Sequence, residues 1–346
     1  MYQNKTFSVP CSPFPVPSIR VGIIGLGRIA SLLQDDSLRE KPCTHSGAIA
    51  ANPECALVCG CDTDAERRRL FGERWGVDVY ADAEVMLRTH KCALLIIATH
   101  PDSHLHYCKL AHHHHIPVVI CEKPLANTLK DAKKIAALTR CGELKIIINH
   151  ERRYSADYIK AKSVLDAGTL GALCSVKATL AMGRSRRLVD VLWHDGTHLV
   201  DAIQFLSGGT LKHKIHFGAP LKQNTGTAFF CAAILRPPQK NIACVIEIGA
   251  ESDLLVFEID MMLTRGRIRI GNGIFEIWQS APCTYAEGFR SLIKIEDGWQ
   301  GKTAYFSNML SDAVACFRSE SPPPQSSAED ALAVIRYLES VGGSGE

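Results

Sequence analysis

The chain has 346 residues, 46% of them hydrophobic, and its 39 lysines and arginines nearly balance 36 aspartates and glutamates. This length predicts two domains with sizeable cores, and the even charge argues against a nucleic-acid partner. No apolar run reaches the roughly 18 residues of a membrane span, and the N-terminus lacks the apolar centre of a signal peptide. We therefore expect a cytoplasmic protein whose partners are small molecules or further copies of itself.

The first part of the chain predicts alternating strands and helices. Residues 1–18, rich in proline and serine, are expected to form a flexible arm. The expected strands are 21–24, 57–61, 94–98, 118–121 and 145–149. The expected helices begin near Arg28 and cover 64–75, 103–113 and 129–140, and the polar stretch 34–44 is expected to be a surface insertion. This alternation predicts a doubly wound parallel sheet in a first domain over residues 19–149.

After residue 150 the pattern changes to strands in succession. Helices are expected over 154–167, 197–206, 306–318 and 328–341, and strands over 174–181, 214–217, 227–235, 242–249, 254–259, 264–270 and 273–278. Successive strands predict an open, mostly antiparallel sheet, and so an α+β domain over residues 150–346. We expect helices on one face of this sheet, a homodimer or homotetramer contact on the other, and the last two helices packed back on the first domain.

The 14 cysteines are scattered over predicted strands and helices without a CxxC pair, which is typical of small buried side chains rather than a metal or redox site. Four consecutive histidines, His112 to His115, stand at the end of a predicted helix. Their side chains point in different directions. We therefore expect no metal site in this chain.

Residues 21–30, VGIIGLGRIA, join a strand to a GxGxxA turn. Gly25 permits the tight turn, Gly27 lets the backbone approach a pyrophosphate, and Ala30 lets helix and strand pack closely. A second strand follows at the right distance and ends near Asp62, an acidic residue placed to accept hydrogen bonds from an adenosine ribose. The combination predicts a Rossmann domain that binds a nicotinamide dinucleotide.

The choice between NAD and NADP rests on the same acidic residue. A carboxylate at Asp62 repels a 2′-phosphate, which favours NAD. Arg67 and Arg68 lie one helical turn later and would soften that preference.

Two polar motifs follow the next strands. The first, ATHPDSH at 98–104, either lines the nicotinamide side of the cofactor crevice or merely caps a helix, with His104 on the surface. The second is Glu122-Lys123-Pro124. Near a positively charged nicotinamide the pKa of Lys123 would fall, so it could exchange a proton with a reacting hydroxyl. The alternative is a surface lysine before a turn proline.

A third motif, WHDGTHLVD at 193–201, places several ionisable residues on one helix face. His198 is flanked by His194, Asp195 and Asp201 at helical spacing. Removing hydride from an alcohol carbon requires the hydroxyl proton to leave as well, and a histidine held by a carboxylate does this near neutral pH. The alternative is that Asp195 is a helix cap and His198 an ordinary helical residue.

Taken in order, these motifs closely resemble the glucose-fructose oxidoreductase, inositol dehydrogenase and rhizopine catabolism (Gfo/Idh/MocA) family of NAD(P)-dependent oxidoreductases. The resemblance covers about residues 19–208 and rests on VGIIGLGRIA, CDTD, ATHPDSH, CEKPLA, NHERRY and HDGTHLVDAIQFL. It implies an NAD(P)-dependent dehydrogenase that acts on a secondary hydroxyl of a sugar, an inositol or a sugar derivative, and Asp62 favours NAD as its cofactor.

The resemblance also implies roles for individual residues. Lys123 would be the catalytic lysine and His198 the general acid/base, with Asp195 or His194 as its partner, because the family's usual aspartate position is His194 here. The residues implied to hold the dinucleotide are Gly25, Gly27, Arg28, Ile29 and Asp62, with Thr99, His104 and Glu122 at its nicotinamide half. Those at the substrate are Arg153, at the cleft, and Arg184, which with Arg186 and Arg187 either recognises an anionic group or forms a solvated basic loop.

Two alternatives of other classes remain at this stage. One is a cofactor-binding regulator without turnover, because the family includes a transcriptional repressor of galactose metabolism. The other is a glycosidase that uses tightly held NAD for transient oxidation. The presence of both Lys123 and His198 argues against the regulator.

Overall fold

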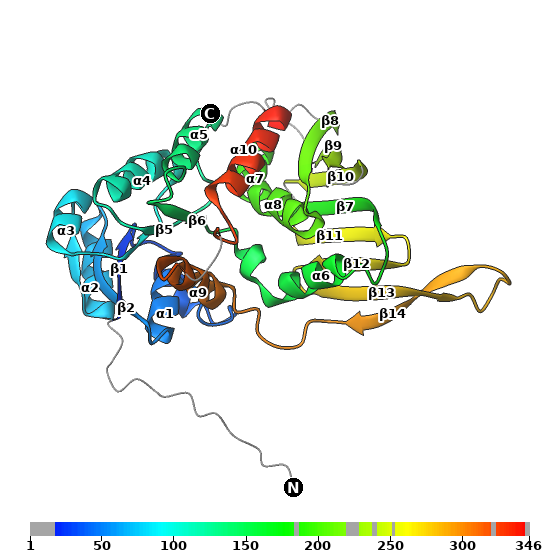
Figure 1. The fold of residues 1–346 in the computed structure, drawn as a ribbon, viewed down its shortest axis with the longest axis horizontal. Helices are drawn as coiled ribbons and strands as arrows, with labels where there is room; N and C mark the ends of the chain where they lie inside the picture. Colours follow the sequence, from blue (N-terminus) through cyan, green and yellow to red (C-terminus); the bar gives the residue numbers. More distant parts are fainter. Residues whose placement is uncertain are drawn as a thin grey trace, which may run out of the picture.

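The computed structural model describes residues 18–182, 187–218, 228–236, 241–250, 253–319 and 323–342. Residues 1–17 of the expected arm lie outside these described ranges. Figure 1 shows two sheets next to each other, with helices around the first and between the two.

The first sheet is parallel and has six strands in the order β3-β2-β1-β4-β5-β6. Every residue of β4 and β5 is buried, as in strands that helices cover on both faces. The strands are β1 (Ile19–Ile24), β2 (Cys55–Cys61), β3 (Asp78–Tyr80), β4 (Leu94–Ile97), β5 (Val118–Cys121) and β6 (Lys145–Ile148). The helices are α1 (His45–Ala51), α2 (Ala65–Trp75), α3 (Ala83–Thr89), α4 (His104–His113) and α5 (Leu129–Leu138). This strand order is that of a Rossmann fold, so the predicted fold class of the first domain is confirmed.

The prediction of a helix that begins near Arg28 is wrong. The chain makes one helical turn, in which the Leu33 amide donates to the Arg28 carbonyl at 2.9 Å, and then a short 3-10 turn, η1 (Leu32–Asp35). A polar segment containing Pro42, which cannot continue a helix, separates this turn from α1. The regular helix starts only where the Thr44 hydroxyl accepts a hydrogen bond from the Gly47 amide at 3.0 Å.

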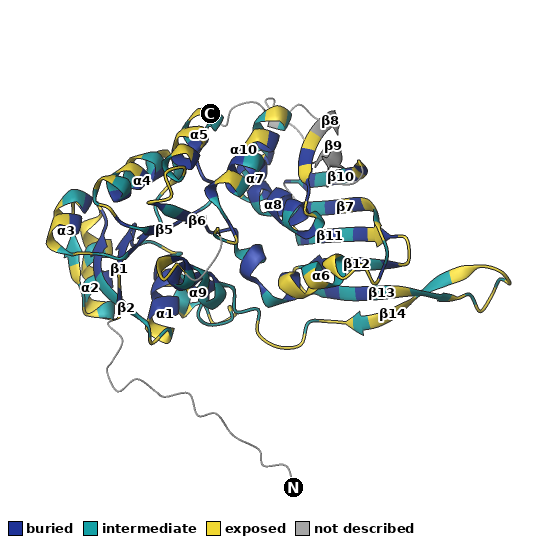
Figure 2. Cartoon of the chain, viewed as in Figure 1, coloured by how far each residue is buried: buried dark blue, intermediate teal, exposed yellow. Residues whose placement is uncertain are grey.

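The second sheet has eight strands in the order β14-β13-β12-β11-β7-β10-β9-β8. The pair β7 and β10 is parallel, and the other neighbours are antiparallel. The strands are β7 (Leu173–Met182), β8 (Thr210–Gly218), β9 (Ala228–Arg236), β10 (Ile242–Gly249), β11 (Leu255–Leu263), β12 (Gly266–Gly271), β13 (Ile274–Pro282) and β14 (Arg290–Asp297). The expectation of an open, mostly antiparallel sheet is confirmed. Figure 2 shows buried residues alternating with more exposed ones along its central strands, whereas the end of the hairpin of β13 and β14 projects and is largely exposed.

Helices fill the space between the two sheets. They are α6 (Ala156–Asp166), α7 (Leu188–His194), α8 (Gly196–Ser207) and α10 (Ala328–Gly342), preceded by the 3-10 turn η3 (Glu151–Tyr154). Helix α9 (Tyr305–Phe317) returns to the first domain, where Phe306, Met309 and Leu310 share a core with Ile23 and Ile120. The path of the chain therefore brings η3, the junction of α7 and α8, and the start of α9 to the region between the domains (Figure 1).

Candidate active site

The glycine turn after β1 has the geometry that its sequence predicts. Gly25 has a φ of +88°, and a Cβ there would lie 2.7 Å from the Ala98 carbonyl, so only glycine fits. At Gly27 the nearest atom to an added Cβ would be Arg67 Nη1, at 3.8 Å. The backbone of Gly27 is thus open to a ligand, as a pyrophosphate site requires.

Asp62 lies directly beside this turn. Its Oδ2 accepts a hydrogen bond from the Leu26 amide at 2.8 Å, and its Oδ1 accepts one from the Asp64 amide at 2.9 Å. Arg67 Nη1 stands 3.8 Å from Oδ2, and the Arg67 side chain is half exposed. The turn and the carboxylate therefore form one cradle, and its residues fit the adenosine and pyrophosphate of a dinucleotide.

The loops after β4 and β5 are joined through His104. This side chain is fully buried, so the alternative of a surface histidine is wrong. Its ring nitrogens lie 3.1 Å from the Thr99 carbonyl oxygen and 3.3 Å from that of Leu125, and burial holds the pKa of His104 below its ordinary value. The Thr99 hydroxyl contacts the Ser103 hydroxyl at 2.7 Å. His104 thus fixes the two loops that frame the expected nicotinamide half of the site.

Lys123 follows β5 and reaches the second domain. Its peptide bond to Pro124 is cis. Its Nζ donates to the His194 carbonyl at 3.0 Å and lies 3.3 Å from His194 Nδ1. Burial lowers the pKa of Lys123, although the carboxylates of Asp195 and Glu122 oppose this. The predicted lysine therefore stands where the end of α7 meets the first domain.

The ionisable residues of the third motif do not act as one cluster around His198. Asp195 Oδ1 lies 3.0 Å from His194 Nδ1, while Asp201 turns to Arg153 and His150. The Nδ1 of His198 is buried without a hydrogen-bond partner among the described residues. Burial and the positive charges of Lys123 and Arg152 hold the pKa of His198 well below its ordinary value. His198 is therefore a neutral imidazole at neutral pH, able to accept a proton.

Arg153 is held by protein contacts within the second domain. Its Nε donates to both oxygens of Asp201, at 3.0 and 2.9 Å, and its Nη1 donates to the Gln325 carbonyl at 3.0 Å. Asp201 is 1% exposed and Arg153 is 7% exposed. The substrate contact expected for Arg153 stays a prediction, and these contacts favour a structural role.

The neighbouring Arg152 is a functional candidate that sequence reasoning missed. Its guanidinium lies 3.6 Å from the centre of the Phe257 ring and donates to Glu151 at 2.9 Å. Its positive charge lowers the pKa values of both Lys123 and His198. The two arginines are adjacent in the sequence, and only the turn of η3 decides which one faces the proton-carrying groups.

A second group that the sequence did not reveal surrounds Glu122. The Glu122 Oε1 accepts hydrogen bonds from His45 Nε2 at 2.7 Å and from Asn149 Nδ2 at 2.6 Å. Burial favours the neutral acid, but these hydrogen bonds and the charge of Lys123 hold the pKa of Glu122 below its ordinary value. His45 and Glu122 are 77 positions apart in the chain, so no sequence spacing indicates their pairing.

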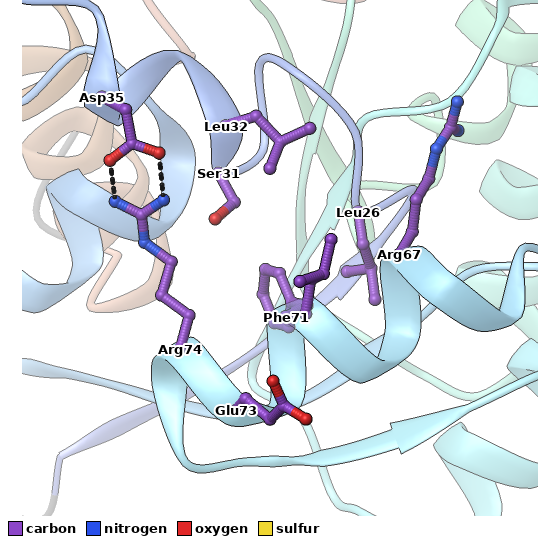
Figure 3. Close-up of a pocket in the computed structure, with 9 residues that line it drawn as sticks. Leu26, Ser31, Leu32, Asp35, Arg67, Phe71, Glu73 and Arg74 are labelled. Carbon is purple, nitrogen blue, oxygen red and sulfur yellow. Dashed lines mark hydrogen bonds and ion pairs between the residues drawn. The ribbon is translucent and has the colours of Figure 1, made fainter.

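Two cavities lie near these groups. The larger, of about 400 Å³, is bounded by the glycine-turn segment and α2, and Figure 3 shows the paired Asp35 and Arg74 at one side and Phe71 in its wall. None of its lining residues comes from the region of Lys123. The smaller, of about 220 Å³, is lined by Glu151, Arg152, Asp157 and Tyr305 among others. This second cavity adjoins the residues whose charges reach Lys123.

Several expectations concern residues away from this centre. Arg184 and Arg186 lie outside the described residues, while Arg187 is exposed and pairs with Asp190 at 2.7 Å. Among the described residues, no three histidine, cysteine or acidic side chains are grouped to hold a metal ion. In the same part of the chain, no helix combines the length and apolarity needed to cross a membrane.

Residues 19–150 match an oxidoreductase family with an NAD-binding Rossmann fold, designated GFO_IDH_MocA. The match covers the parallel sheet and its helices, so it identifies this domain as similar to the NAD-binding domain of that family. Relatives include the D-apiose dehydrogenase of Rhizobium rhizogenes, 25% identical over 62% of this chain and 65% of that protein. The inositol 2-dehydrogenase of Salmonella typhimurium is 28% identical over 44% of this chain and 43% of that protein. The chain thus matches less than two thirds of the length of each of these relatives.

Solved structures resemble the chain over nearly its whole length. A dehydrogenase from Chromobacterium violaceum has a TM-score of 0.77 at 14% identity, covering 94% of this chain and 95% of that one. The WlbA dehydrogenase of Bordetella pertussis, solved with NADH and UDP-GlcNAcA, has a TM-score of 0.73 at 18% identity, covering 96% and 97%. These likenesses establish that the second domain shares the fold of such proteins.

Proposed function

We propose that this chain is an NAD-dependent dehydrogenase that oxidises a secondary hydroxyl of a sugar, an inositol or a sugar derivative. The observation that carries the proposal is the meeting of Lys123 Nζ with the His194 carbonyl, 3.0 Å apart. It joins an amine of the dinucleotide-binding domain to the helix junction that carries Asp195 and His198. Bound NAD would supply the hydride acceptor.

Each residue of the centre has a task in this chemistry. The glycine turn and Asp62 bind the pyrophosphate and adenosine. His104 orients the two loops at the nicotinamide half, with Thr99 and Glu122, whereas Arg28 and Ile29 contact the dinucleotide from the turn. Lys123 positions the substrate hydroxyl, and the neutral His198 accepts its proton as the carbon is oxidised. Burial and the nearby cations favour the neutral imidazole at His198, which is the form that can accept a proton.

The cavity beside Arg152 supports a hydroxylated substrate. Its lining includes the carboxylates of Glu151 and Asp157, the amide of Asn272 and one guanidinium. Because this lining has two carboxylates and only one arginine, it favours an uncharged polyhydroxyl ligand over one that carries a carboxylate or a phosphate. D-apiose and inositol, named in the relatives described above, belong to this class of ligand.

The test is NAD reduction followed across a panel of polyols, sugars, sugar acids and nucleotide sugars. Lys123→Ala is expected to lower turnover at least ~100-fold, the range of general acid–base catalysis, while NADH still binds. Lys130→Ala, at an exposed position of α5, is the matched control and should retain turnover. Full activity of Lys123→Ala would refute the assignment, and release of free sugar without net NADH would favour the glycosidase.

We also infer that the protein is a cytoplasmic homo-oligomer that associates through its second sheet. Helices α6, α7 and α8 contact β12, β10 and β7, and they cover one face of the sheet. On the opposite face, Arg269 pairs with Glu258 and Glu276, and Lys294 pairs with Glu276. Rows of opposite charge on one broad face are self-complementary in a two-fold contact.

A further inference from the structure

The carboxylate of Glu122 is buried, which is unusual for a charged group. Glu122 is 7% exposed and His45 is 2% exposed, and the two side chains meet at 2.7 Å. A carboxylate only accepts hydrogen bonds, so the Nε2 of His45 must carry the proton between them. Isolated burial would neutralise such a carboxylate. His45 and Asn149 are the donors that keep it charged.

His45 is fixed independently of the sheet. It is the first residue of α1, and its amide donates to the Ile29 carbonyl at 3.2 Å. Its ring packs edge-on against Phe306, with ring centres 5.1 Å apart. The backbone and ring contacts thus hold the His45 imidazole on the Glu122 oxygen.

The charge of Glu122 acts on the next residue in the chain. Charged groups reach Lys123 from each element around it: Asp195, with the largest effect, from the α7–α8 junction, Glu122 from the end of β5, and Glu151 and Arg152 from η3. His194 contacts its Nζ directly. Glu122 is the most buried of the carboxylates in this set. Its charge is therefore screened least by water.

We propose that His45 is a positioning residue for Lys123: by donating to Glu122 it keeps that carboxylate ionised, and so maintains a negative charge that stabilises the Lys123 ammonium. This inference rests on the role proposed for Lys123 in proton exchange. Without the imidazole donor, the buried Glu122 takes up a proton, and Lys123 loses its proton at lower pH. The charge state of the catalytic amine is thus set partly from α1, outside the site itself.

The experiment measures the titration of Lys123 without any substrate. Trace acetylation with acetic anhydride between about pH 6 and pH 11, followed by mass spectrometry of the Lys123 peptide, gives the pH at which the amine becomes reactive. Four variants are compared with the unmodified protein: His45→Leu, which removes the donor; His45→Gln, which keeps an N–H donor; Glu122→Gln, which removes the charge; and His90→Gln. His90 is the matched control, because it also pairs with a carboxylate, Asp78, at 3.4 Å, but on the far edge of the first sheet.

His45→Leu and Glu122→Gln are expected to move the Lys123 titration down by about one pH unit, the effect of losing one nearby opposite charge. His45→Gln and His90→Gln should titrate like the unmodified protein. An unchanged titration in folded His45→Leu overturns the proposal. If His45→Leu does not fold, Glu122→Gln decides, and an unchanged titration there overturns it equally.

NADH binding, followed by fluorescence, separates this inference from the proposed function. Unmodified protein that binds no NADH contradicts the dehydrogenase. Protein that binds NADH in all folded variants, with a Lys123 titration indifferent to His45, contradicts only the positioning role.

Discussion

Lys123 of the first domain donates a hydrogen bond to the main-chain carbonyl of His194 in the second. A main-chain acceptor cannot be removed by changing the His194 side chain. The lysine is therefore held at the domain junction by the fold itself, and the side chains around it are left to adjust its charge.

Arg67 is expected to contribute to the discrimination between NAD and NADP. It stands 3.8 Å from Asp62 Oδ2, where a 2′-phosphate would meet its guanidinium, and a charged hydrogen bond of this kind gives roughly tenfold in affinity. Arg67→Ala should weaken NADPH binding about tenfold and change NADH binding less than about twofold. Fluorescence titration of both reduced cofactors is the measurement.

Arg69→Ala is the control for that comparison. Arg69 lies on the same helix with similar exposure but pairs with Glu66 and Glu73, away from Asp62. Equal losses of NADPH affinity in the two variants would show that only the general positive charge of α2 matters.

The activity at low pH is expected to depend on Arg152. Its charge helps to hold the pKa of His198 below the ordinary value, so neutral His198 persists, and NAD reduction continues, at pH values below about 6.5. Removing the charge in Arg152→Gln raises the pKa of His198. The acid limb of the kcat profile should therefore shift to higher pH. If the acid limb of the kcat profile does not shift in Arg152→Gln, a group other than His198 is responsible for it.

The buried pair of Asp201 and Arg153 is expected to be a major source of stability. Asp201→Asn leaves the arginine without its charge partner, which costs about 3–5 kcal/mol for a buried pair. Asp166→Asn breaks the exposed contact with Lys162 and should cost under ~1 kcal/mol. Urea denaturation of both variants checks the difference, and equal costs would contradict the structural role of Arg153.

The same pair predicts the direction of acid sensitivity. The pKa of Asp201 is lowered in the folded protein because Arg153 and His150 outweigh its burial. Its stabilising contribution is therefore complete above its unfolded pKa, about 3.9, and is lost as the pH falls towards the lower folded value. The stability difference between Asp201→Asn and the unmodified protein should shrink in acid.

Arg269→Glu is expected to separate the subunits. Arg269 pairs with two carboxylates on the sheet face opposite to helices α6, α7 and α8, so the substitution adds negative charge where copies would meet. Light scattering should give a dimer or tetramer for the unmodified protein and a monomer for the variant. Arg88→Glu, on α3 of the first domain, is the control, and a monomeric unmodified protein would rule out the association.

The sequence predicted the first domain well where its strands are continuous apolar runs, as at residues 94–97 and 118–121. It missed β3, which has only three residues and an exposed Asp78, and β14, where polar residues alternate with exposed isoleucines. The start of α1 was misplaced because the glycine turn usually leads directly into a helix. Here an inserted polar segment intervenes.

Within the site, Lys123, His198 and the cofactor turn could be predicted from the sequence, because each belongs to a short contiguous motif. Arg152 and Arg153 are indistinguishable in sequence, and only the geometry of η3 turns one towards Lys123 and the other towards Asp201. The contact of His45 with Glu122 depends on how α1 packs on the sheet. Such a pairing across the fold leaves no local trace in the chain.

The inserted segment has one further structural effect. Glu40 accepts hydrogen bonds from the amides of Thr303 and Ala304, at 2.7 and 2.9 Å, and from the Thr303 hydroxyl at 2.9 Å. These residues lie where the chain crosses back from the second domain to α9. The insertion thus ties the connection that enters α9 to the first domain by three hydrogen bonds, so the two domains are linked there by a side chain as well as by the chain itself.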